Sequence, residues 1–306
     1  MNVAMEIERL RGLFPPIPTP FDEQERLAVH RLRSNLERWR ACGFSGFVVL
    51  GSTGEFVHLN DGERLRVLSA AREALPGDAL LIGGCSLHSL RDTMAYIHAA
   101  AGEGVDAVLV NTPCYYPQAR EPSQLAAYYR HLADRAPVPI LLYNVPQFTG
   151  VSIPPHLVAE LAEHPNIIGI KESSGNLRVL TEIARLVPSD FVVLTGSAST
   201  FYPALLIGAQ GGILAAACVA WEACRGIFDA VQSGQLTKAR HLQMQLLPLI
   251  EAITTRWGIG GLKAAMDLRG LYGGPPRAPL PSVDESARAE IEHLFTHSGL
   301  FSPLEL

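Results

Sequence analysis

Lys171 is the residue whose surroundings most favour covalent chemistry. It ends the apolar run IIGIK (167–171), whereas the other two lysines of the chain, Lys238 and Lys263, do not end such a run. An ammonium group is costly in an apolar interior, and desolvation favours the free amine, which can attack a carbonyl carbon. The alternative is a lysine that extends to solvent and pairs with a carboxylate.

Tyr143 lies near the end of the apolar run that precedes this lysine, ILLYN (140–144). Neighbouring strands of a sheet lie about 5 Å apart, so a phenol at the end of an adjacent strand can reach both the lysine and a substrate bound to it. Because a phenol can carry a proton between reacting groups, we expect Tyr143 to act as a proton relay. A tyrosine that only packs, with its hydroxyl in water, is the alternative.

Two loops that follow apolar runs complete the set of candidate groups. In GSTGE (51–55), the glycines permit a tight turn, and the hydroxyls of Ser52 and Thr53 add donors to its backbone amides. Such a nest can hold a carboxylate, although an ordinary turn has the same composition. The loop TPCYYP (112–117) places two aromatic residues between prolines, either over the mouth of the site or at a subunit contact.

Eight apolar runs, rich in Val, Ile and Leu, alternate with amphipathic segments along most of the chain. Continuous rather than alternating apolar runs are typical of parallel strands buried on both faces, and eight such units predict a (β/α)8, or TIM, barrel. A doubly wound open sheet is the alternative, but PIPTPF after the first run is not a glycine-rich phosphate turn. The predicted strands are LFPPIPT (13–19), GFVVL (46–50), LLIGG (80–84), AVLVN (107–111), ILLYN (140–144), IIGIK (167–171), FVVLT (191–195) and GGILA (211–215).

The strand pattern stops after about Ala217, and the remainder predicts helices. We expect them from about Trp221 to Ser233, Leu236 to Arg256, Gly260 to Leu271 and Asp284 to Thr296. We therefore predict a barrel domain over residues 1–233 and a helical C-terminal domain over residues 234–306.

Composition narrows the class of protein. The chain has 306 residues, a formal net charge of -5 with both signs scattered, and five cysteines without a C-x-x-C pair. We expect no nucleic-acid partner, no metal site and small buried thiols in a reducing compartment. No apolar run reaches the ~18 residues that span a bilayer, and MNVAMEIERLRGLF is a poor signal peptide, so we expect a cytoplasmic protein without a membrane partner.

These motifs together resemble the dihydrodipicolinate synthase / N-acetylneuraminate lyase family, the class I pyruvate-dependent aldolases that work through a Schiff base. The resemblance covers nearly the whole chain and implies a TIM barrel, a small 2-oxo acid substrate, no metal or organic cofactor, and a homotetramer made of two tight dimers. The motifs that carry it are PTPF (18–21), GSTGE, TPCYY, YNVPQFTG (143–150), GIKESSGN (169–176) and GLKAAMDLRGLYGG (261–274).

The resemblance also implies a role for each matching residue. Lys171 matches the Schiff-base lysine and Tyr143 the tyrosine that relays protons, while Tyr115 matches a tyrosine that reaches across a dimer contact into the neighbouring site. The remaining matches concern substrate binding: Ser52 and Thr53 at the pyruvoyl carboxylate, Ile213 through its main-chain carbonyl, and Ser173, which follows the lysine.

Phe148 departs from the pattern of the synthases. Dihydrodipicolinate synthases carry an arginine at this place of V-P-x-R-T-G to hold the carboxylate of aspartate semialdehyde, and a phenyl ring cannot replace a guanidinium. TPCYY, the stretch 258–280 and FTHSGL (295–300) look most like 4-hydroxy-2-oxoglutarate aldolases. We therefore expect cleavage of that acid to pyruvate and glyoxylate. The alternatives are a dihydrodipicolinate synthase, a lyase or dehydratase for a 2-keto-3-deoxy sugar acid or an aromatic aldehyde adduct, and a non-catalytic keto-acid binding protein.

Overall fold

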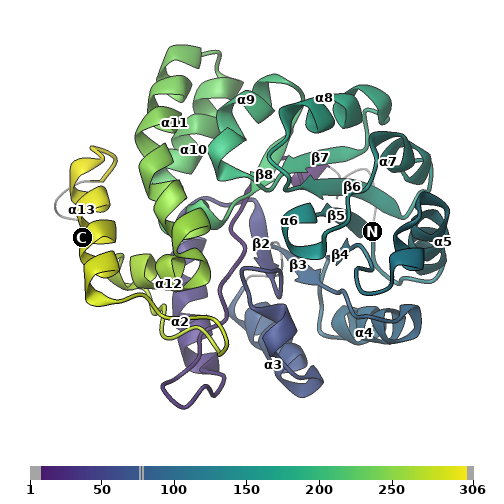
Figure 1. Ribbon diagram of the computed structural model, residues 1–306, viewed down its shortest axis with the longest axis horizontal. Coiled ribbons are helices and arrows are strands. Elements are labelled where there is room, and N and C mark those ends of the chain that lie inside the picture. The colour runs from purple at the N-terminus through teal and green to yellow at the C-terminus, as the bar shows by residue number, and fades with distance from the viewer. Residues whose placement is uncertain (1–7, 76, 78, 302–306) are drawn as a thin grey trace.

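Eight parallel strands form a barrel at the centre of the computed structural model, which describes residues 8–75, 77 and 79–301 (Figure 1). Their order is β1-β8-β7-β6-β5-β4-β3-β2, so consecutive strands are neighbours around the sheet. This order confirms the predicted barrel and excludes the open sheet. The strands are β1 (Leu13–Phe14), β2 (Gly46–Val49), β3 (Leu80–Gly84), β4 (Ala107–Asn111), β5 (Ile140–Asn144), β6 (Ile167–Glu172), β7 (Val192–Thr195) and β8 (Gly211–Ile213).

The barrel closes between β1 and β2 through a segment that contains two prolines. The expected strand 13–19 is regular only over Leu13–Phe14, because Pro15 and Pro16 have no N–H to donate to a ladder. Their carbonyls still accept: Val48 donates its N–H to the Pro15 carbonyl at 3.1 Å, and Ile17 donates to the Val48 carbonyl at 2.7 Å. An isolated parallel bridge between Pro16 and Val48 completes the contact.

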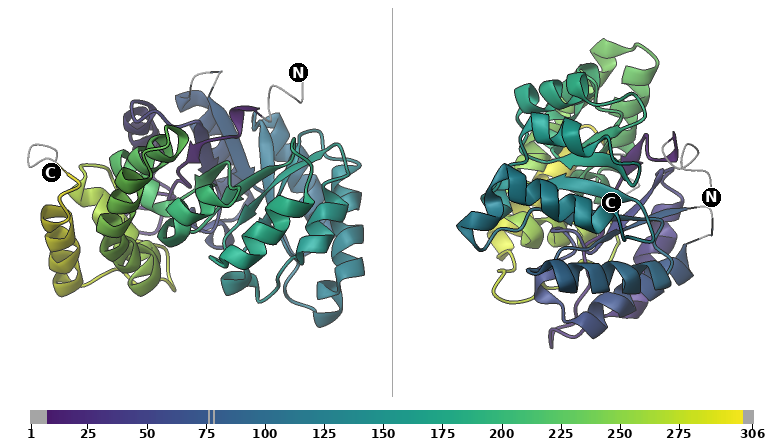
Figure 2. Two further views of the ribbon diagram at one scale, coloured as in Figure 1. Left: turned by 90° about the horizontal axis from the view of Figure 1, so that it is seen from above. Right: turned by 90° about the vertical axis from the view of Figure 1, so that its right-hand side faces the viewer.

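Helices surround the barrel (Figures 1 and 2), and three of them, together with the last helix of the described chain, begin at a side chain that caps the first turn. Asn60 forms a capping box with Glu63, and Ser89, Asn176 and Asp284 accept hydrogen bonds from backbone N–H groups of the helices that follow them. Around the barrel lie α2 (Val29–Arg40), α3 (Asp61–Ala74), α4 (Leu90–Gly102), α5 (Pro122–Ala133), α6 (Pro146–Thr149), α7 (Pro155–Leu161), α8 (Leu177–Leu186), α9 (Phe201–Leu206) and α10 (Trp221–Gln232).

The predicted helical extension follows α10 and packs beside it and near α2 (Figure 1). Its helices are α11 (Leu236–Ile250), continued as a π-helix over Glu251–Arg256, then α12 (Gly258–Leu268) and α13 (Glu285–His297). The apolar core outside the barrel continues into this extension, because Leu246 and Phe295 belong to the same cluster as Ile227 of α10. The domain boundary at residue 233 stays a prediction.

Two further expectations concern membrane-spanning helices and a signal peptide. No helix in the described part of the chain is long and apolar enough to cross a bilayer. The first seven residues of the stretch that we judged a poor signal peptide lie outside the described residues.

An extra residue in β6 decides which of its side chains face the inside of the barrel. Ile140 pairs with Ile167, but Leu141 pairs with Gly169, so Ile168 has no partner of its own on β5. Ile168 belongs to the apolar cluster inside the barrel, whereas Ile170 belongs to the cluster between barrel and helices. Residues two apart in a regular strand share a face, so this bulge reverses the alternation between them.

Gly169 gives the bulge the space that it needs. A Cβ atom at this position would lie 2.5 Å from the carbonyl oxygen of Val192 and 2.8 Å from Cδ2 of Leu141, both closer than real contacts allow. Only glycine fits here without moving the backbone of β7.

We predict that Gly169→Ala destabilises the protein by roughly 1–3 kcal/mol, as overpacking of a core does. The measurement is the midpoint of thermal unfolding. The matched control is Gly102→Ala at the end of α4, where an added Cβ meets nothing within 4 Å. Equal midpoints for the two variants would contradict the account of the bulge.

Candidate active site

Lys171 and Tyr143 lie side by side inside the barrel, as residue partners on β6 and β5. Only 4% of Lys171 and 5% of Tyr143 is exposed. The Lys171 Nζ lies 4.4 Å from the centroid of the Tyr143 ring, which is within the range of a cation–π contact. Within the described residues, no carboxylate is at ion-pair distance from this Nζ. The expected alternative, a lysine paired with a carboxylate at the surface, is therefore not what the structure has.

The turn after β2 brings a hydroxyl to this pair. Ser52 Oγ and Tyr143 Oη lie 3.3 Å apart, and either oxygen can donate. The turn is tight, because Leu50 and Glu55 at its two ends both have positive φ, 59° and 55°. Thr53 follows Ser52 in the turn and is half-buried. The structure thus brings the turn to Tyr143 through Ser52.

Ser173 and Lys171 both lie against the backbone of Gly196. A Cβ atom at Gly196, just after β7, would lie 1.8 Å from Ser173 Oγ and 3.0 Å from Lys171 Cε. Both side chains therefore use the space that Gly196 leaves. Ser173 Oγ is buried and has no hydrogen-bond partner among the described residues. An unsatisfied hydroxyl beside the lysine stem is able to bind a polar substrate group.

Two other expected site residues have less direct geometry. Ile213 ends β8, where it pairs with Phe14, and it belongs to the same interior cluster as Tyr143. Tyr115 is 73% exposed and makes an edge contact with Tyr116, with ring centroids 5.0 Å apart. The structure therefore does not bring Tyr115 into contact with Lys171 within one chain.

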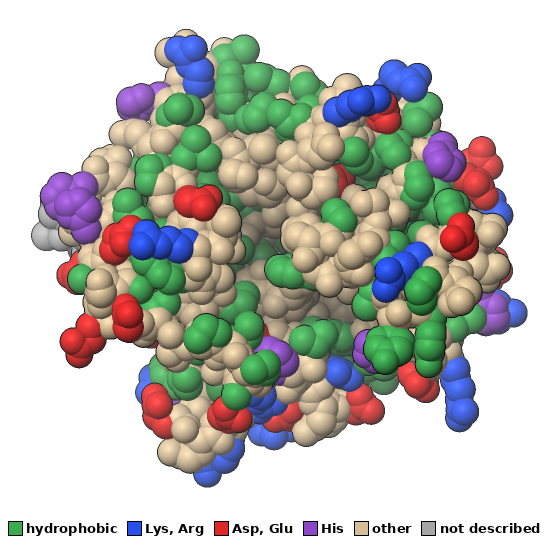
Figure 3. All heavy atoms as spheres, viewed as in Figure 1, with side chains coloured by type: hydrophobic (Ala, Val, Ile, Leu, Met, Phe, Trp, Pro, Cys, Tyr) green, Lys and Arg blue, Asp and Glu red, His purple; other side chains and the backbone are tan. Residues whose placement is uncertain are grey.

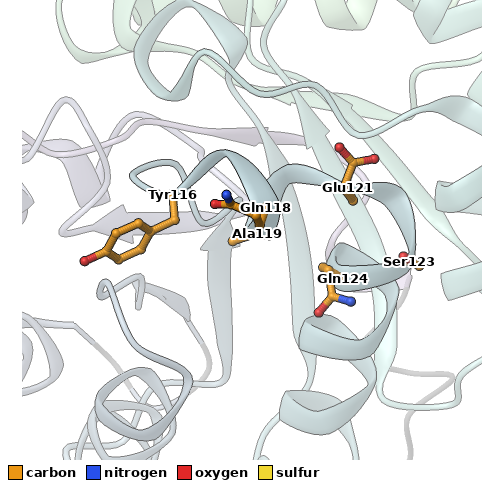
Figure 4. Close-up of a pocket in the computed structure, with 6 residues that line it drawn as sticks. All are labelled: Tyr116, Gln118, Ala119, Glu121, Ser123 and Gln124. Atoms are coloured by element: carbon orange, nitrogen blue, oxygen red, sulfur yellow. The ribbon is translucent and has the colours of Figure 1, made fainter.

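A hollow of about 600 Å³ lies beside this aromatic pair (Figure 4). It is open to the surface, and it is lined by Tyr116, by Gln118 in the 3-10 turn that follows it and by Gln124 in the first turn of α5, rather than by the residues around Lys171. We therefore do not identify it with the candidate active site.

Charged side chains of both signs are scattered over the face of the molecule in Figure 3.

Four of the five thiols are protonated near neutral pH, because burial raises their pKa values. Burial raises the pKa of Cys42 to about 11 and that of Cys224 to about 12, and it raises the pKa values of Cys85 and Cys218 as well. The expectation of buried thiols is wrong for Cys42 and Cys114, which are only half-buried. No group of three or more His, Cys, Asp or Glu side chains that could hold a metal ion occurs in the described part of the chain.

Sequence reasoning missed a second buried lysine. Lys263 is 1% exposed, less than Lys171, and its Nζ lies 2.6 Å from Oε1 of Glu55 at the end of the GSTGE turn. No local pattern pointed to it, since Lys263 lies within a helix of the extension and does not end an apolar strand. Burial lowers the pKa of Lys263, and the neighbouring carboxylate of Glu55 opposes that shift.

The sequence model of the dihydrodipicolinate synthetase family matches residues 9–298 of the chain. The chain belongs to this family. A 4-hydroxy-tetrahydrodipicolinate synthase of Methanoculleus marisnigri is 34% identical over 294 residues, which cover 94% of this chain and 99% of the relative. A dihydrodipicolinate synthase structure from Cyanidioschyzon merolae with lysine bound has a TM-score of 0.90 at 26% identity and covers 96% of this chain and 99% of that chain.

A prophage protein of the dihydrodipicolinic acid synthase family from E. coli K12, solved in complex with pyruvate, has a TM-score of 0.89 at 27% identity and covers 95% and 99% of the two chains. Membership makes this protein a class I pyruvate-dependent aldolase, a carbon–carbon lyase that acts on a small 2-oxo acid. The names of the relatives fit the synthase alternative better than the expected 4-hydroxy-2-oxoglutarate aldolase.

Proposed function

We propose that Lys171 forms an imine with the keto carbon of pyruvate and that the enzyme makes or breaks a carbon–carbon bond at the pyruvate methyl carbon. The observation that carries the proposal is a buried lysine that has no carboxylate partner among the described residues and lies against a tyrosine ring at 4.4 Å. Such a lysine, once deprotonated, is a nucleophile for a carbonyl. No metal or organic cofactor enters this proposal.

In the proposed mechanism, the amine adds to the carbonyl carbon and water leaves as the imine forms. For bond formation, the protonated imine loses a proton from its methyl carbon, and the resulting enamine attacks the carbonyl carbon of an aldehyde, whose oxygen takes up a proton. For bond cleavage these steps run in reverse: the hydroxyl of the adduct loses its proton, the carbon–carbon bond breaks, and its electrons pass to the imine. Tyr143, 3.3 Å from Ser52 Oγ, moves protons to and from the reacting oxygen. Hydrolysis of the imine releases the product and restores the free amine.

The other site residues hold the substrate in the proposed mechanism. Ser52 and Thr53 bind the pyruvoyl carboxylate through the turn after β2. The Ser173 hydroxyl, which has no partner among the described residues, and the Ile213 carbonyl bind further polar groups of the substrate. We further propose a homotetramer of two tight dimers in which Tyr115, exposed in the single chain, reaches the site of a second copy. A mass of one 33.1 kDa chain in sedimentation equilibrium would contradict this assembly.

Incubation with pyruvate and borohydride should label Lys171 alone, as peptide mass mapping will show. Lys238 is exposed on α11, outside the barrel, and Lys263 is held by Glu55, so neither offers its amine beside Tyr143. The control is Lys171→Met, which should take up no label. Label on Lys238 or Lys263, or none at all, would overturn the proposed chemistry.

The first candidate for the second substrate is aspartate semialdehyde, because the relatives named here are 4-hydroxy-tetrahydrodipicolinate synthases. The second candidate is 4-hydroxy-2-oxoglutarate, which the enzyme would cleave to pyruvate and glyoxylate. Phe148 favours this candidate, because a phenyl ring cannot hold the carboxylate of the semialdehyde as an arginine would. Phe148 lies in α6, directly after β5, and is 71% exposed. Gln147 anchors the same short helix beside the lysine strand by donating Nε2–H to the Ser173 carbonyl at 2.9 Å.

The ratio of kcat/KM for condensation and for cleavage on one preparation distinguishes the two candidates. We expect condensation to exceed cleavage. Phe148→Arg should raise condensation further, by about tenfold, because a charge-assisted hydrogen bond to the semialdehyde carboxylate contributes roughly 1.5–3 kcal/mol. Phe148→Leu, the matched control, should not. Cleavage that exceeds condensation would replace the first candidate with the second.

A further inference from the structure

The GSTGE turn is attached to the C-terminal extension by a buried ion pair. Glu55 ends the turn, Lys263 lies in α12, and the 2.6 Å pair that they form is almost fully shielded from water, with side-chain exposures of 0% and 1%. Taking two charges out of water has a desolvation cost that their attraction does not reliably repay. Such a pair is therefore weak evidence for a contribution to the stability of the fold. Its position at the end of the GSTGE turn points to another role.

The Glu55 side of the pair is tied to the residue that contacts Tyr143. Glu55 donates its backbone N–H to the Ser52 carbonyl at 3.1 Å. It adopts a left-handed conformation, with φ 55°, and its side chain reaches Lys263 of α12. The second carboxylate oxygen, Oε2, accepts the Arg277 N–H at 2.8 Å. Both oxygens of Glu55 are therefore held by the C-terminal extension, while its backbone holds Ser52.

The Lys263 side is equally fixed. Its ammonium donates to the Pro275 carbonyl at 3.0 Å and lies 4.7 Å from the centroid of the Phe21 ring. The Arg277 guanidinium covers the same ring at 4.1 Å and forms two hydrogen bonds with Glu63 of α3, at 2.7 and 2.8 Å. Segments from both ends of the chain thus meet around Phe21 and enclose the ion pair, leaving little freedom for Glu55 to shift.

We propose that Glu55 and Lys263 are a positioning pair, through which the C-terminal extension sets the place of the turn that binds the carboxylate of the 2-oxo acid. This inference rests on the proposed function of Ser52 and Thr53. The pair acts through the backbone bond between Glu55 and Ser52, and it touches neither substrate nor Lys171. Its loss moves the turn away from Tyr143 and weakens the binding of pyruvate before it affects the bond that forms at Lys171.

The test is Lys263→Met, with the pyruvate concentration that gives half-maximal borohydride trapping as the readout. We expect this concentration to rise roughly tenfold or more, because a misplaced binding group of this kind has effects of up to about a hundredfold. At saturating pyruvate the label should still appear on Lys171. Glu55→Gln is a second variant that keeps an acceptor for Arg277 and removes the charge, and it should shift the concentration in the same direction.

The matched control is Arg269→Met, at the C-terminal end of the same helix. Arg269 is also buried and ion-paired, with Glu222 at 2.5 Å, but the structure gives it no contact with the turn. We expect this variant to lower the midpoint of thermal unfolding and to leave the half-maximal concentration unchanged. In the double variant of Glu55 and Lys263, the shift should be smaller than the sum of the single shifts, since the two act as one unit.

Two outcomes separate this inference from the function on which it rests. If the unsubstituted protein is trapped at Lys171 but Lys263→Met and Glu55→Gln lower only the unfolding midpoint, as Arg269→Met does, the pair is structural and the inference is wrong. If the unsubstituted protein is not trapped at all, the proposed function itself is wrong, and the inference falls with it.

Discussion

The extra residue of β6 is the constraint on which the active site depends. Without the bulge opposite Ile140 and Leu141, Ile170 and Glu172 would face the barrel interior together with Ile168, and Lys171 would point outward at the helices. With it, Lys171 is the register partner of Tyr143 on the inside of the barrel. The bulge requires Gly169, because any Cβ atom there would collide with the Val192 carbonyl. A local irregularity in one strand therefore decides which side chain the substrate meets.

The two buried lysines show how their surroundings assign different tasks to the same group. Lys263 has a carboxylate at 2.6 Å and a carbonyl acceptor, so its charge is matched and its ammonium is held in place. Lys171 has an aromatic face and no carboxylate at ion-pair distance among the described residues, so no ion pair occupies its nitrogen. In our account the first lysine orients the carboxylate-binding turn and the second bonds to the substrate.

The sequence was sufficient for the architecture and for the central pair of residues. Tyr143 and Lys171 lie at the ends of consecutive apolar runs, ILLYN and IIGIK, and parallel strands in sequence order must place such ends together. The ends of the strands were less predictable: the run 13–19 is regular only at Leu13–Phe14, because its prolines cannot donate. A run that is apolar throughout also carries no alternation, so nothing in IIGIK showed that the strand would bulge or which face Lys171 would take.

Contacts between distant segments were beyond sequence reasoning for a physical reason. The Glu55–Lys263 pair joins the second strand's loop to a helix far along the chain, and neither residue has a local pattern that requires the other. The orientation of Ser173 was equally hidden, since it depends on the space left by Gly196, just after the neighbouring strand β7. Recognition of the second substrate depends on the shapes of loops and short helices such as α6 with Phe148, and these shapes do not follow from local sequence patterns. The motifs therefore identify the family but not the aldehyde.

A crystal structure of the protein after reaction with pyruvate and borohydride is the most direct test of this account. We predict continuous density from Lys171 Nζ to the former keto carbon, inside the barrel beside the Tyr143 ring, with the carboxylate at Ser52 and Thr53. Density that joins pyruvate to Lys263, or pyruvate bound away from Lys171, would contradict it.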